Sequence, residues 1–252
     1  MARQAANGAG FYLYAVILGT QDRVYGPIGL EGSPVYTVGK GRVAAVVSDV
    51  PSGRIRPERR HLAAHQEVLR RLLEETTPLP MSFGIITKDK RALDRIIAQN
   101  QKGFHEQLLR LDGKVEMGLH VLWDVPNIFE YFVLTHPDLR AARDLFLGSH
   151  REPTQEEKIE VGRMFDRILQ EDRESYSESV REALVPYCSE IKNNPPRNER
   201  EVINLACLVL REQQAVFESG IFEAARLFDH NFTFDYNGPW APHNFVDMRI
   251  QF

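Results

Sequence analysis

The sequence predicts an α+β protein made of two small domains. Two observations lead to this class: apolar strand-like runs alternate with amphipathic helical patterns, and a glycine-containing hairpin joins two of the strands. Hairpins combined with helices of unequal length favour two α+β units over one doubly wound sheet. The 252 residues suffice for one large or two small domains. We expect an N-terminal domain over residues 1–112 and a C-terminal domain over residues 113–252.

In the N-terminal domain, strands are predicted where β-branched and aromatic residues run together between glycines and prolines. These strands cover residues 11–18, 35–38, 43–48 and 80–87. Leucines at helical spacing predict a helix between Pro57 and Pro78. A second helix follows and ends at Asp112 and Gly113. Its apolar face consists of Leu93, Ile97, Phe104, Leu108 and Leu111.

The C-terminal domain has longer helices. Thr154 and Glu157 form the pattern of a capping box, which opens a helix that continues to Leu184. The apolar run at residues 202–210 fits either a central strand or the start of a buried helix. A helix and the alternating aromatic strand from Phe232 follow. The order strand, long helical excursion, strand, helix, strand predicts a modified ferredoxin-like fold with long helices.

Composition excludes several classes of protein. A net charge of −4 and a pI near 6.1 provide no long-range attraction for phosphates, so a nucleic-acid partner is not expected. No apolar run approaches the ~20 residues that span a bilayer, so no membrane partner is expected either. The two cysteines, Cys188 and Cys207, provide no disulfide framework and are typical of a reducing compartment. We therefore predict a cytoplasmic protein.

The sequence contains few patterns that are typical of catalytic, cofactor or metal sites. The sequence has no phosphate loop, dinucleotide fingerprint or nucleophile elbow. His61 and His65 are four residues apart on a predicted helix, which is a spacing that can hold a metal. The metalloprotease pattern also requires glutamate directly after the first histidine, and Leu62 occupies that position. We therefore favour a structural role for both histidines and expect no catalytic residue, no metal and no cofactor.

Basic residues gather before and within the first predicted helix. A nucleic-acid reader pairs such a patch with exposed aromatic side chains for base stacking, and this stretch has none. A solvated or partner-facing basic surface is the favoured interpretation. Its candidate partner-contact residues are Arg56, Arg59 and Arg60.

The C-terminal tail is an irregular segment that contains large aromatic residues. Trp240 lies between two prolines, and Phe245 follows five residues later. The favoured interpretation is a tail that folds back and covers the sheet of the second domain, with Trp240 buried. The alternative is an adhesive surface for an apolar partner, in which Trp240 and Phe245 are contact residues.

Several segments together resemble a known family. They are Tyr12-Leu13-Tyr14, the strand at residues 44–50, the helix at residues 65–69, the segments 79–84 and 116–124, and the closing Gly238-Pro239-Trp240-Ala241-Pro242-His243-Asn244-Phe245-Val246. In this order, from end to end, the chain resembles the gas vesicle accessory proteins of the F and L type, with the F type favoured. It departs from the expected pattern at Ser82, where a basic residue is expected, and at His243, where an aromatic residue is more usual.

The resemblance implies a non-enzymatic protein that is needed to form the gas-filled shell. Its implied partners are the gas vesicle shell protein and other gas vesicle accessory proteins, and its implied location is the cytoplasm or the vesicle. The rival interpretation is a ligand-binding regulatory or enzymatic ferredoxin-like module with a small-molecule cleft.

Overall fold

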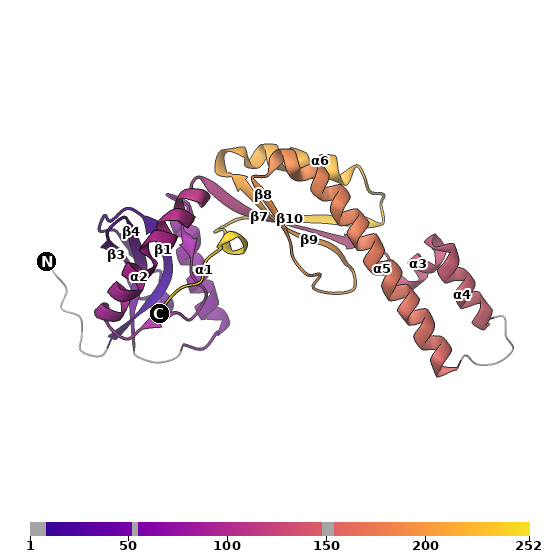
Figure 1. Ribbon diagram of the computed structural model, residues 1–252, viewed down its shortest axis with the longest axis horizontal. Helices are drawn as coiled ribbons and strands as arrows, with labels where there is room; N and C mark the ends of the chain where they lie inside the picture. The colour runs from indigo at the N-terminus through magenta and orange to yellow at the C-terminus, as the bar shows by residue number, and fades with distance from the viewer. Residues whose placement is uncertain (1–8, 52–54, 148–153) are drawn as a thin grey trace. The chain divides into compact units, whose positions relative to one another are not determined.

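The computed structural model describes residues 9–51, 55–147 and 154–252. It has an α+β fold with two separate sheets, as the sequence predicts (Figure 1). Contacts divide the chain into two compact units. The first contains Met1–Glu116 together with Gly238–Phe252, and the second contains Met117–Asn237. The tail therefore groups with the first unit, whereas the sequence led us to expect it on the second domain.

The sheet of the first unit is built around its longest strand, β1. The strands follow the order β2-β3-β4-β1-β5, and β6 also pairs with β1. They are β1 (Ala9–Leu18), β2 (Val24–Gly26), β3 (Val35–Lys40), β4 (Val43–Pro51), β5 (Leu79–Pro80) and β6 (Ile86–Thr87). β1 and β4 are antiparallel, with an irregularity in β1 between Leu13 and Ala15.

The strand predicted at residues 80–87 is interrupted. Only its two ends pair with β1, as β5 and β6. Gly84, between them, has a positive φ of 91°, a conformation that glycine adopts without steric cost. Its backbone N–H donates to the Tyr12 hydroxyl at 3.1 Å instead of joining a ladder. A glycine inside an apolar run thus splits one predicted strand into two.

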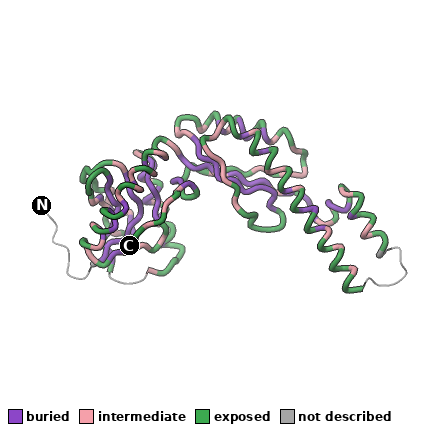
Figure 2. The backbone as a smooth tube through the Cα atoms, viewed as in Figure 1, coloured by how far each residue is buried: buried purple, intermediate pink, exposed green. Residues whose placement is uncertain are grey.

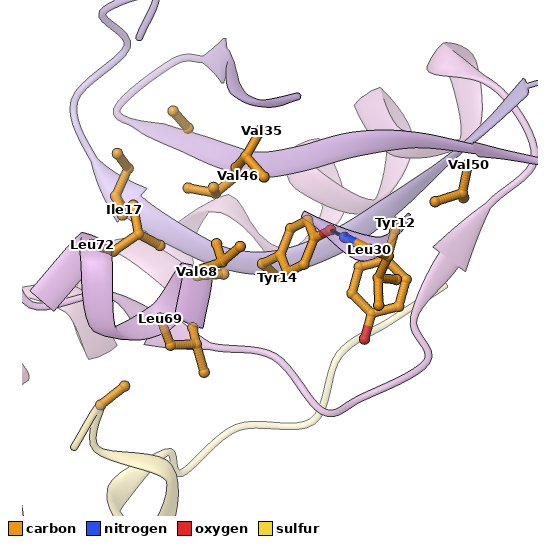
Figure 3. Close-up of a cluster of buried hydrophobic side chains, with 13 residues drawn as sticks. Tyr12, Tyr14, Ile17, Leu30, Val35, Val46, Val50, Val68, Leu69 and Leu72 are labelled. Carbon is orange, nitrogen blue, oxygen red and sulfur yellow. Dashed lines mark hydrogen bonds between the residues drawn. The ribbon is translucent and has the colours of Figure 1, made fainter. Parts of the chain in front are cut away.

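Two helices cover this sheet. The first, α1 (Arg59–Leu73), packs Val68, Leu69 and Leu72 into a cluster with Tyr12 and Tyr14 of β1 (Figure 3). The second, α2 (Lys90–Leu111), begins at Asp89, whose side chain accepts a hydrogen bond from Ala92 N at 2.7 Å. It contacts β1, β3 and β4. Nearly all of β1 is buried, because side chains on both faces of the strand are covered.

The second unit has the element order β-α-α-α-β-β-α-β and the sheet order β10-β7-β9-β8. Its strands are β7 (Lys114–Trp123), β8 (Glu190–Asn193), β9 (Glu201–Leu210) and β10 (Phe232–Trp240). Its helices are α3 (Ile128–Thr135), α4 (Pro137–Leu147), α5 (Gln155–Leu184) and α6 (Gln214–Ala225). The modified ferredoxin-like fold expected from the sequence stays a prediction for this unit. The sequence had predicted neither β8 nor the hairpin that it forms with β9.

The core of the second unit lies between its sheet and its long helices. α5 and α6 both contact β9 and each other, and Figure 2 shows the buried strands beneath the largely exposed turns of these helices. The predicted capping box is present: Thr154 Oγ1 accepts from Glu157 N, and the Glu157 carboxylate accepts from Thr154 N. At the far end of β7, the fully buried Trp123 ring meets Phe132 edge to face.

Short 3₁₀ turns occur in both units. They are η2 (Val185–Tyr187), η3 (Arg211–Gln213) and η4 (His243–Phe245); a fourth, η1 (Leu30–Gly32), lies in the first unit. Among the described residues, no helix combines the length and the apolar character needed to cross a bilayer.

Candidate functional site

The C-terminal tail is held to the first unit by a buried carboxylate. Glu116 at the start of β7 is 7 % exposed. Its two oxygens accept hydrogen bonds from Asn244, at 2.8 Å from the backbone N and at 2.6 Å from Nδ2. Hydrogen bonds to an ionised carboxylate are among the strong ones in proteins. This pair explains why a glutamate and an asparagine occur in the two segments that carried the family resemblance.

Further contacts hold the tail along α2. The guanidinium of Arg110 donates to the carbonyl of Phe245, whose ring is fully buried. Near the end of the chain, Asn100 and Gln251 exchange two hydrogen bonds, at 2.8 and 2.9 Å. The tail is thus fastened to α2 by polar contacts at Phe245 and at Gln251.

Trp240 differs from the rest of this tail. Its side chain is 44 % exposed, although Ala241 directly after it is 4 % exposed. The expectation that Trp240 is buried is therefore wrong, and Phe245 is the ring that fills the interior. Trp240 is the last residue of β10, before the chain turns into η4. An exposed tryptophan next to a rigid segment is a typical anchor in protein interfaces.

A second polar cluster lies inside the first unit. The Tyr12 hydroxyl and His65 Nδ1 are 2.9 Å apart, and both side chains are buried. Because the Tyr12 oxygen already accepts from Gly84 N, we assign its hydrogen to the bond with His65. The Nε2 atom of His65 is buried as well. Burial raises the pKa of Tyr12 to about 12, so both members of the pair are neutral at physiological pH.

The tail reaches this cluster through His243. Burial lowers the pKa of His243, and its charge would in turn disfavour protonation of His65. His243 also lines a cavity of about 220 Å³ between the segment after β5 and the end of the tail. The cavity is lined by Pro80, Met81, Ser82, His243, Val246, Met248 and Ile250. Both positions that depart from the family pattern, Ser82 and His243, therefore lie in one cavity.

The pH dependence of stability should report on His65. Burial, followed by the effect of His243, lowers its pKa to about 4, from 6.5 in an unfolded chain. Between these values the unfolded state binds more protons, so the free energy of unfolding falls as pH falls from 6.5 to 4, by roughly 3 kcal/mol. Urea unfolding at several pH values measures this slope. The variant His65→Gln should flatten it, and an unchanged slope in that variant would assign the effect to other groups.

The three arginines predicted to contact a partner are exposed and lie at the start of α1. Arg60 pairs with Glu58 at 2.9 Å and with Glu31 at 3.3 Å. In the described part of the chain, the side chains of Arg56 and Arg59 carry no ion pair. Exposed pairs of this kind contribute little to stability, so the arginines are available to an acidic partner at small cost.

The two histidines of α1 have separate environments. His61 Nε2 lies 2.6 Å from Glu31, which raises the pKa of His61, and its Nδ1 lies 2.9 Å from the carbonyl of Arg56. His65 instead faces Tyr12. The described residues contain no group of three or more histidine, cysteine or acidic side chains that could hold a metal ion.

A buried polar network in the second unit was missed by the sequence analysis. His120 Nδ1 lies 3.0 Å from Glu201 Oε1, and Arg197 Nη2 lies 3.0 Å from His120 Nε2. Both imidazole nitrogens are therefore satisfied, which suits a structural role. His120 and Glu201 are 81 positions apart in the sequence. The three residues form no short motif, so no sequence pattern indicates that they lie together.

Comparison with known proteins adds the decisive observation. The family model described as gas vesicle synthesis protein GvpL/GvpF matches residues 10–247, which include all of the second unit and most of the first unit and of the tail. The chain belongs to the GvpL/GvpF family. This family is a gas vesicle protein family and not a known enzyme family.

Relatives in the GvpL/GvpF family match over most of their length. Gas vesicle protein F of Streptomyces sp. (strain CB03234) is 29% identical over 88% of this chain and 92% of the relative. Gas vesicle protein F of Dolichospermum flosaquae is 24% identical over 94% of this chain and 97% of the relative. Gas vesicle protein L1 of Halobacterium salinarum is 23% identical over 97% of this chain and 92% of the relative.

Two crystal structures in the same family share the fold. The structure of GvpF from Anabaena sp. PCC7120 has a TM-score of 0.83 and 23% sequence identity, and the match covers 96% of this chain and 99% of the other. The structure of GvpF from Microcystis aeruginosa has a TM-score of 0.79 and 22% identity, with 95% and 99% covered.

Proposed function

We propose that this protein is a non-enzymatic accessory protein required for gas vesicle formation. It works in the cytoplasm and acts by contact with the gas vesicle shell protein or with other gas vesicle accessory proteins. The observation that supports this most directly is the family match over residues 10–247, which leaves neither unit outside the family. A shell subunit exposes a strongly apolar side before assembly, and a binding protein that covers this side would prevent aggregation.

The contact surface that we propose combines an aromatic anchor with basic side chains. Trp240 supplies the anchor, because it is a large ring that the fold leaves 44 % exposed. Arg56, Arg59 and Arg60 supply exposed cations on the same unit. Phe245 contributes indirectly, since its buried ring keeps the tail in place. Aromatic and arginine side chains are the types most enriched among residues that dominate binding energy.

Substituting Trp240 with alanine should separate binding from folding. Because the ring is partly exposed, we expect the melting temperature to change little, while binding to the major shell protein weakens by ~2 kcal/mol or more. Pull-down with the major shell protein beside a thermal melt measures both. A matched control is Leu109→Ala on α2, which removes a 57 % exposed apolar side chain of the same unit.

The cellular test uses the same variants. Deletion of the gene should abolish vesicles without altering growth on defined carbon sources, and the Leu109→Ala chain should restore them. Normal vesicles in the deletion strain would contradict the proposed function. Normal vesicles with the Trp240→Ala chain would contradict only the proposed anchor.

A further inference from the structure

β10 is an edge strand of unusual length in this protein. The other strands at sheet edges are β2 with three residues, β5 and β6 with two each, and β8 with four. β10 has nine residues, and the part of the chain that the structure describes places no strand on its outer side. Proteins usually keep edge strands short, because a long row of unpaired N–H and C=O groups is a template for another strand.

The strand is also accessible along its whole length. None of its nine residues is buried, although seven of the ten residues of the neighbouring β7 and nine of the ten residues of β9 are buried. The aromatic side chains of one face contact other rings: Phe232 meets Tyr176 of α5, and Phe234 meets Phe228 in the turn after α6. These ring contacts fix the strand in an extended conformation while its edge stays open.

The main-chain groups that face outward can be assigned. The carbonyl of Asn231 accepts from Asp124 N at the end of β7, so it faces β7. Main-chain groups of successive residues in a strand point to opposite sides. The N–H and C=O groups of Phe232, Phe234 and Tyr236 therefore face away from β7, whereas those of Thr233 and Asp235 face it.

The charge along this edge identifies the kind of strand that fits it. Residues 227–248 contain three aspartates and no lysine or arginine. Asp235 lies exposed in the middle of β10. Asp124, next to the start of this strand, accepts a hydrogen bond from Thr233 Oγ1 at 3.2 Å. Lysine, the residue that often protects an edge from unwanted pairing, is absent.

We propose that β10 is a docking strand, which pairs through Phe232–Tyr236 with an extended segment of a partner protein that carries a lysine or arginine opposite Asp235. Strand addition of this kind takes its affinity from main-chain hydrogen bonds and its selectivity from side chains. A second copy of this chain fits less well, because antiparallel self-pairing centred on Asp235 would bring the two Asp235 carboxylates together. The inference names a binding mode for the proposed function, but it rests on the edge itself.

Amide hydrogen exchange on the full chain tests this directly. The probes are two blocked nine-residue peptides of alternating threonine and valine, one with a central lysine and one with a central glutamate. We expect the lysine peptide to slow exchange at the amides of Phe232, Phe234 and Tyr236. The amides of Thr233 and Asp235 should stay unchanged, because they already face β7. The glutamate peptide should bind about fivefold more weakly, since like charges on paired strands repel.

A charge reversal on the edge provides the variant test. Asp235→Lys should reverse the preference, so that the glutamate peptide binds more tightly than the lysine peptide. The matched control is Glu182→Lys, which makes the same charge change at an exposed position of α5 and should leave the preference unaltered. Asp235 is exposed, so neither substitution should prevent folding.

Three results would overturn the inference. They are exchange at the outward amides that neither peptide alters, equal binding of both peptides, and dimers of the free protein in sedimentation that protect the same amides. The last result would assign the edge to self-pairing. Because the peptides replace the natural partner, these results do not depend on binding to the shell protein, and a failure of the proposed function would be seen separately.

Discussion

Replacing Phe245 with alanine is expected to lower the free energy of unfolding by about 3–5 kcal/mol. The ring is fully buried in the first unit, and its loss leaves a cavity beneath the tail. The tail's other attachments, such as Glu116 with Asn244, cannot move inward to fill this space without losing their hydrogen-bond geometry. Urea denaturation followed by near-ultraviolet circular dichroism measures the loss.

Trp240→Ala serves as the paired comparison, because it removes a larger ring from the same tail. It should cost far less than Phe245→Ala, in keeping with its exposure. If both variants lost equal stability, or if Trp240→Ala lost more, the assignment of Phe245 as the ring that anchors the tail would be wrong.

The second large effect is expected at Arg173, in the middle of α5. Its side chain is 9 % exposed and donates to three backbone carbonyls, of Asn198, Glu199 and Glu201, at 2.8 to 3.1 Å. Its guanidinium also lies 5.7 Å from the centre of the Trp123 ring. Burial lowers the pKa of Arg173, and the nearby charges of Glu199, Asp166 and Glu201 act in the opposite direction. Arg173→Met should therefore cost about 3 kcal/mol, because the carbonyls lose their donor.

An exposed arginine of the same helix provides the control. Arg167 is 66 % exposed and lies 3.8 Å from Glu171. Arg167→Met should change the free energy of unfolding by less than about 0.5 kcal/mol. If the two substitutions had the same effect, Arg173 would contribute only as a surface charge, and the contacts to the loop before β9 would carry no stability.

The sequence predicted those secondary-structure elements that are determined by interactions between residues close together in the chain. The capping box at Thr154 predicts the start of α5, since both of its hydrogen bonds join residues three positions apart. The apolar run at residues 202–210 left strand and helix open, because a fully buried segment has no polar face to show its period. It is the strand β9. β8 was missed because its four residues are only partly buried and show little apolar pattern.

The site depended on contacts that join distant parts of the chain. The sequence shows that the tail contains Trp240 and Phe245, but it does not show which of the two side chains is buried. The predicted burial of Trp240 was wrong for this reason. The arginines at the start of α1 were recognised by their clustering, which is a local property. Neither the bond between Tyr12 and His65, 53 positions apart, nor the hydrogen bonds from Asn244 to Glu116 have a sequence signature.

The discontinuous first unit has a consequence for synthesis on the ribosome. Residues 238–252 complete this unit, yet they are translated after all of residues 117–237. Nascent chains usually fold their N-terminal domain first. Here the second unit is continuous and is fully synthesised before the first unit can receive its tail, as the 151 positions between Asn100 and Gln251 illustrate. Until then the surface that Phe245 will cover stays open, which creates an interval during translation in which a chaperone can bind it.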